Sequence, residues 1–197
     1  MKKLLFSIVA LSMILGAGTV PVDAAGGRVP IYEVPIDSPG SYYLSRDLTG
    51  SSGSALITIA SDDVTLDLAG HTIRRTDAGG DVIASSGNRT NIEILNGRID
   101  GLSVVDAGGR GIAVGWAHLG VIQNNVVHNA TLDGIVVEYS GGVTVADNNS
   151  SRNGGDGIDI LSSTGMRVDR NHASFNGDYG IYFTGRLEAP RSPSRFT

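Results

Sequence analysis

The chain has 197 residues, a formal net charge of −5, 28 glycines and no cysteine. This acidic balance excludes the basic surface that nucleic-acid binding requires, and without cysteine no disulfide can hold the fold together. No window shows the 3.6-residue apolar period of a helix, so the glycine-rich composition indicates short strands joined by many tight turns.

Residues 1–24 have the layout of a secretory signal peptide. Lys2 and Lys3 precede an apolar run from Leu4 to Leu15, and Val22-Asp23-Ala24 supplies small residues at a cleavage site after Ala24 or Ala25. A retained N-terminal anchor is the alternative. No later apolar run approaches the roughly 18 residues of a membrane helix. The mature chain is therefore expected to have no membrane span and to be secreted or periplasmic.

Residues 25–50 contain Pro30, Pro35 and Pro39 and follow no repeat. The end of a stacked repeat structure exposes sheet edges and core, so it has to be covered. We predict that this segment is an N-terminal cap, with Tyr42 to Leu44 entering the first repeat as a strand.

A repeat of 23 residues organises the later chain. Gly-Ile pairs begin at Gly111, Gly134, Gly157 and Gly180, and each unit holds short β-branched runs separated by turn residues. One such unit cannot bury an apolar face, whereas stacked units can. Residues 51–184 therefore predict an all-β, right-handed parallel β-helix of about six coils with three short strands per coil.

Asparagines share the phase of this repeat, at Asn125, Asn148 and Asn171. Asparagine tolerates the left-handed backbone conformation of a sharp turn, and stacked asparagines can hydrogen-bond along a ladder. We predict both features for this column.

The period stops after Phe183. Residues 185–197 carry three arginines and two prolines with little apolar content, a composition typical of disorder. This segment is expected to be a disordered tail or the end of a truncated chain.

The mature chain resembles the right-handed parallel β-helix repeat family of the pectin-lyase-like superfamily. The resemblance covers about residues 38–184 and is carried by Ser38 to Leu44, by Asp62 to Ile73 and by the coils that follow. The family includes polysaccharide lyases, galacturonan hydrolases, alginate epimerases and non-catalytic binders. The resemblance therefore implies the fold and leaves the activity open.

In a β-helix the inward residues form the core, so function falls to outward side chains and turns. Alternation places Ile135 and Val137 inward and Val136 outward. The equivalent outward and turn positions define one strip along the stack, which we call the acidic strip. Its predicted binding residues are Arg110, Asp133, Glu138, Tyr179 and Tyr182, and its predicted catalytic residues are Asp156 and Asp159.

Two interpretations of these carboxylates stay open. Asn153 to Ile160 is similar to the Asn-Thr-Asp-Gly stretch of galacturonan hydrolases, with Asp156 at the acidic position, but the family's other catalytic motifs are absent. An aspartate before glycine is also ordinary turn chemistry. No cofactor motif is evident and no metal-ligating residues are assigned, although carboxylates in adjacent coils would suit Ca²⁺.

Two functions are compatible with this pattern. The first is an exported, non-catalytic module that binds a polysaccharide or a cell-surface component through the acidic strip. The second is a lyase or hydrolase of acidic glycans of the pectate or alginate type. Trp116 and Tyr139, just beyond the outward strand, could extend a sugar-binding platform or could cover a loop.

Overall fold

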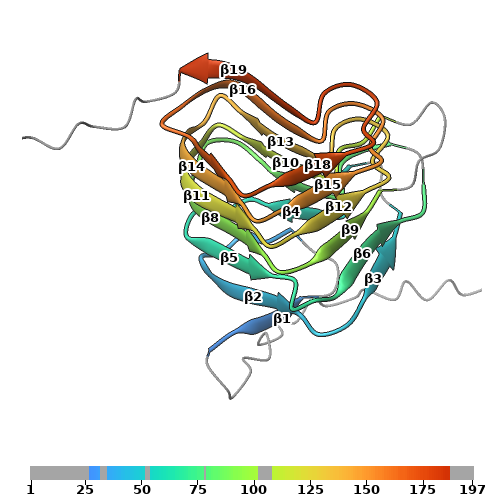
Figure 1. Cartoon of the computed structure of the whole chain (residues 1–197). Coiled ribbons are helices and arrows are strands. Elements are labelled where there is room, and N and C mark those ends of the chain that lie inside the picture. The colour runs from blue at the N-terminus through green and yellow to red at the C-terminus, as the bar shows by residue number, and fades with distance from the viewer. Residues whose placement is uncertain (1–26, 32–34, 52–53, 78, 102–107, 187–197) are drawn as a thin grey trace, which may run out of the picture.

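The computed structural model describes residues 27–31, 35–51, 54–77, 79–101 and 108–186. The predicted signal peptide and most of the predicted tail lie outside these residues. Within them every regular element is a β-strand, and the strands pair in parallel from one coil to the next. None of these elements is a helix long and apolar enough to cross a membrane. Figure 1 shows the strands stacked from β1 at one end to β19 at the other, which confirms the predicted parallel β-helix.

The strands form three faces that run along the stack (Figure 1). The first face comprises β4 (Ile57–Ile59), β7 (Ile83–Ser85), β10 (Ile112–Gly115), β13 (Ile135–Glu138), β16 (Ile158–Thr164) and β19 (Ile181–Arg186). The second comprises β1 (Val29–Ile31), β2 (Gly40–Leu44), β5 (Val64–Asp67), β8 (Arg89–Leu95), β11 (Ala117–Gln123), β14 (Gly141–Ala146) and β17 (Arg167–Asp169). The third comprises β3 (Leu48–Gly50), β6 (Thr72–Arg75), β9 (Arg98–Asp100), β12 (Val126–His128), β15 (Asn149–Ser151) and β18 (His172–Ser174).

The 23-residue period is the length of one coil. On the first face Ile112 pairs with Ile135, Ile135 with Ile158, and Ile158 with Ile181. The first three of these isoleucines are completely buried. The first three Gly-Ile pairs therefore each place one apolar side chain at the same position in a continuous core.

Alternation along these strands predicts side-chain direction correctly but exposure wrongly. Val136 and Ala113 do not belong to the apolar core cluster that contains their neighbours. Val136 is nevertheless only 1% exposed, and Ala113 is also buried. The outward positions of the first face are therefore covered, and the acidic strip is less open than the alternating pattern suggests.

The asparagine column forms the predicted ladder. The side-chain amide of Asn125 donates to the side-chain carbonyl of Asn148, and that of Asn148 donates to Asn171. The predicted left-handed conformation is wrong for these residues: it belongs to Asn124, with φ 57°, and to its equivalents in the next two coils. The ladder asparagine must point its side chain into the stack, so the residue before it makes the turn.

The segment predicted as a cap already contains strands of the coil. β2 pairs with β5 of the second face, and β3 pairs with β6 of the third. Of its strands, β1 and β3 lie at the ends of their sheets, because β1 pairs with β2 alone and β3 with β6 alone. At the other end β19 continues through Gly185 and pairs there with Ser163.

Candidate functional site

The acidic strip lies on the first face, at and just before the amino ends of its strands. Asp133 precedes β13, and Asp156 precedes β16 one coil further along. Asp159 lies within β16, where it pairs with Val136 in one neighbouring coil and with Tyr182 in the other. The coil repeat therefore brings together three carboxylates that the sequence places up to 26 residues apart.

Each turn aspartate also has a structural role. An oxygen of Asp133 accepts the backbone N–H of Asp156 at 2.7 Å, and an oxygen of Asp156 accepts that of Tyr179 at 2.6 Å. Asp81 accepts the N–H of Arg110 in the same way, which the sequence did not predict because this earlier coil departs from the period. These bonds support the turn interpretation, and they engage only one oxygen of each carboxylate.

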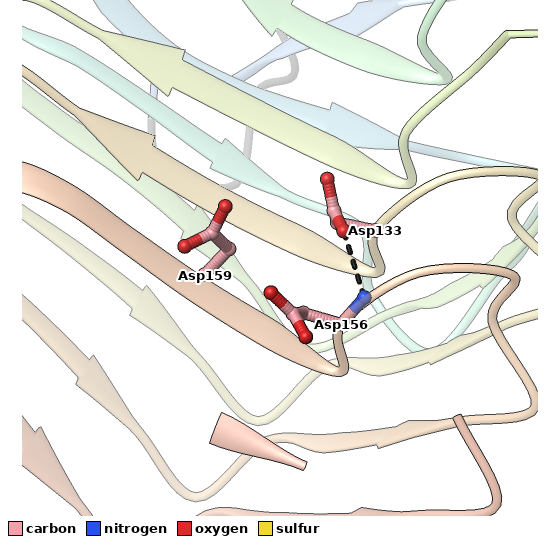
Figure 2. A group of neighbouring side chains, drawn as sticks. All are labelled: Asp133, Asp156 and Asp159. Atoms are coloured by element: carbon pink, nitrogen blue, oxygen red, sulfur yellow. Dashed lines mark hydrogen bonds between the residues drawn. The ribbon is translucent and has the colours of Figure 1, made fainter. Parts of the chain in front are cut away.

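The three carboxylates lie close together, as Figure 2 shows. An oxygen of each of Asp133, Asp156 and Asp159 lies within 4.8 Å of the others. Asp159 is 8% exposed, and its Oδ1 is fully buried without a hydrogen-bond partner among the described residues. An unpaired buried carboxylate oxygen is costly, so this group is suited to take up a proton, a cation or a ligand hydroxyl.

Burial raises the pKa of the Asp159 carboxyl from an ordinary value near 3.8 to about 6, and the neighbouring charges of Asp133 and Asp156 act in the same direction. Arg110 opposes this shift. Burial also raises the pKa of the Asp156 carboxyl. The hydrogen bond from the backbone N–H of Tyr179 lowers this pKa, but its effect is smaller than that of burial. Two adjacent carboxyls thus titrate closer to neutral pH than free aspartate does.

These shifts predict a stability that falls as pH rises. Because the folded state favours the protonated Asp159, it binds more protons than the unfolded state between about pH 4 and pH 6. The free energy of unfolding should decrease across this interval by at most about 3 kcal/mol. Urea unfolding in EDTA at both ends of the interval, compared with the Asp159→Asn variant, measures this contribution. An identical pH slope in the two proteins would contradict it.

The remaining predicted residues surround the carboxylates. Arg110 Nη1 lies 3.8 Å from Glu138 Oε1, and both side chains are partly buried. Tyr179 and Tyr182 stack with ring centroids 5.2 Å apart, and Tyr179 is exposed. The coil repeat therefore brings all seven predicted residues into one neighbourhood: Arg110, Asp133, Glu138, Asp156, Asp159, Tyr179 and Tyr182.

A second aromatic pair lies beyond the strip. Trp116 and Tyr139 follow β10 and β13, and their rings stack with centroids 4.6 Å apart. Both side chains are about half exposed. Their 23-residue spacing is the signal that places them side by side in adjacent coils.

Comparison with known proteins gives a family and a fold. The family described as "Right handed beta helix region" matches residues 46–189. Two solved structures from Azotobacter vinelandii are similar: the A-modules of the mannuronan C-5 epimerases AlgE6 and AlgE4, with TM-scores of 0.53 and 0.51 and sequence identities of 20% and 18%. Each alignment covers 73% of this chain and 50% of the module, so the chain spans about half the length of either module. None of the curated protein sequences matches the chain.

Proposed function

Because this chain belongs to the right-handed β-helix family, we propose that it is an exported module that binds acidic polysaccharides through the acidic strip, with Ca²⁺ held between the carboxylates. The observation that carries this proposal is that oxygens of Asp133, Asp156 and Asp159 lie within 4.8 Å of one another on the first face. The two similar epimerases are named for mannuronan, a polysaccharide, which agrees with this class of ligand.

The negative charges of the acidic strip and of the glycan are the reason for proposing Ca²⁺. The protein is acidic, with a net charge of −5, and an acidic glycan would be repelled by three carboxylates within 4.8 Å of one another. Ca²⁺ takes six to eight oxygen ligands. The free carboxylate oxygens, above all the buried Oδ1 of Asp159, would supply part of this shell, and oxygens of the glycan could complete it.

The strip also offers groups that suit a sugar chain. The exposed ring of Tyr179, stacked on Tyr182, presents an amphipathic surface next to the carboxylates. Arg110 supplies a positive charge beside Glu138 and suits a glycan carboxylate. From Asp133 to Glu138 the strip is roughly 16 Å wide at about 3.3 Å per residue, which is the length of several sugar units.

Calorimetric titration with oligogalacturonate and oligomannuronate, with CaCl₂ or with EDTA, tests the proposal. We expect binding with CaCl₂ and at least about tenfold weaker binding in EDTA or in an Asp156→Asn, Asp159→Asn double variant. Asp62→Asn is the matched control, because Asp62 accepts the N–H of Thr90 from the next coil in the same way but lies on another face. Absence of binding to both acidic oligomers would contradict the proposal.

A catalytic function is the second candidate, and the raised pKa of Asp159, to about 6, favours it. A carboxyl that titrates near neutral pH can act as a general acid or base, and Asp156 lies beside it. Release of unsaturated or reducing sugars from pectate or alginate would support a lyase or hydrolase. Binding without release would favour the non-catalytic module.

A further inference from the structure

The stacked pair of Trp116 and Tyr139 is poorly explained by folding alone. Trp116 is 52% exposed and Tyr139 is 49% exposed, so neither ring gains the stabilisation of full burial. Both residues also have left-handed backbones, with φ of 57° and 50°. Large side chains are uncommon there, and such strain concentrates at functional sites.

The same corner of the neighbouring coils carries small residues. Gly87 in the preceding coil has φ 70°, and Ser162 in the following coil has φ 46°. The four left-handed positions thus form one column along the stack, with the two aromatic rings in its middle. The rings are flanked by glycine on one side and serine on the other.

The face of Trp116 away from Tyr139 is directed to the Gly87 corner, because the stacked Tyr139 belongs to the following coil. A Cβ atom at Gly87 would approach only Nη2 of Arg89, at 3.6 Å, and would meet no atom of Trp116 within 4 Å. Gly87 is itself exposed. The guanidinium group of Arg89 therefore lies at the Gly87 corner, one coil from the half-exposed indole of Trp116.

Arg89 has no side-chain partner within the described ranges. It begins β8, and its backbone N–H donates to the carbonyl of Trp116 at 3.3 Å, which places the two backbones side by side in adjacent coils. Its Nε is buried without a hydrogen bond, and no ion pair within these ranges includes the residue. The Nη2 atom, by contrast, lies at the exposed Gly87 corner, and a planar guanidinium is well matched to a carboxylate.

We propose that Trp116 and Arg89 form a subsite for one uronate unit of an acidic polysaccharide, with the pyranose ring stacked on the face of the indole away from Tyr139 and the sugar carboxylate bound by the guanidinium. Tyr139 backs the indole and holds it in position. The proposal rests on the proposed function and extends it, since this subsite lies past the carboxyl end of β10, at the far end of the acidic strip.

The carboxylates of the acidic strip and the Trp116 corner would then bind the same polymer through opposite charges. At the amino ends of the strands the carboxylates need a cation to approach an acidic sugar. At the Trp116 corner the positive charge belongs to the protein. Glu138, the carboxylate nearest to Tyr139 in sequence, is paired with Arg110 and so repels a uronate less than an isolated carboxylate would. The subsite therefore needs no Ca²⁺ of its own.

Trp116 is the single tryptophan of the chain, so its fluorescence reports on the subsite directly. Titration with oligogalacturonate and with oligomannuronate in CaCl₂ should change the emission of Trp116 and protect it from iodide quenching. We expect Arg89→Gln to weaken binding of both acidic oligomers about tenfold and to leave any binding of neutral cello-oligosaccharide unchanged. Arg98→Gln, on the exposed start of β9, is the matched control.

Trp116→Asn removes the ring and keeps a residue that tolerates the left-handed backbone. We expect it to weaken binding about threefold to tenfold by calorimetry, with Trp116→Phe restoring most of the affinity. If the wild type binds acidic oligomers and neither Arg89→Gln nor Trp116→Asn changes the affinity, this subsite is wrong while the proposed function stands. If the wild type binds no acidic oligomer, the subsite and the proposed function are both wrong. Unchanged thermal unfolding of both variants shows that the fold is intact.

Discussion

Gly134→Ala is expected to lower the free energy of unfolding by at least about 3 kcal/mol. A Cβ at this position would lie 2.5 Å from Nδ2 of Asn153 and 2.7 Å from the carbonyl oxygen of Gly157, and closer still to Oγ of Ser150. The carbonyl cannot retreat freely, because it accepts the N–H of Ile135 and the hydroxyl of Ser150. The glycine of the Gly-Ile repeat is thus required by close packing between coils.

Gly180→Ala provides the matched control, since Gly180 occupies the same position in the last described coil. Its nearest neighbours would be the carbonyl oxygen of Ala173 at 3.4 Å and the Ala173 Cβ at 3.5 Å, which is ordinary contact. We expect its free energy of unfolding to stay within about 0.5 kcal/mol of wild type. Urea unfolding followed by circular dichroism compares the two variants. Equal losses would mean that coil contacts do not explain the glycine column.

The repeat allowed much of the fold to be predicted from the sequence, because a parallel β-helix places residues one period apart directly next to each other. The pairing of Ile135 with Ile158 and the hydrogen bond from Asn125 to Asn148 both follow from this register. The turn geometry did not follow. Arg170 has φ 51°, and nothing in the chemistry of arginine favours a left-handed turn.

The candidate site was predictable to the same extent. The period places Asp156 one coil from Asp133, and their closeness was expected on this ground. The buried oxygen of Asp159 without a hydrogen-bond partner was not expected, because the exposure of a side chain depends on how its neighbours cover the strip. Arg89 and Asp81 were also missed, since their coil is longer than 23 residues and its register with the next coil cannot be read from spacing alone.

Asn148→Ala is the second substitution for which we expect a large loss, of about 3–5 kcal/mol. The side chain of Asn148 is buried and donates to the carbonyl of Ile122 at 2.8 Å and to Oδ1 of Asn171 at 3.0 Å. Its own Oδ1 accepts the backbone N–H of Asn125 at 3.0 Å and the side-chain amide of the same residue at 3.2 Å. Alanine would remove the acceptor of the buried Asn125 N–H and the side-chain donor to the Ile122 carbonyl, and a buried group left unpaired costs about 1–3 kcal/mol.

Asn149→Ala separates this effect from the general cost of replacing an asparagine. Asn149 is the next residue in the chain and is exposed, and its side chain makes no hydrogen bond within the described ranges. Its free energy of unfolding should stay within about 0.5 kcal/mol of wild type. A large loss for Asn148→Ala beside a small one for Asn149→Ala would show that the ladder stabilises the coils. Similar values for the two variants would mean that water replaces the ladder at little cost, and that the apolar columns alone hold the stack together.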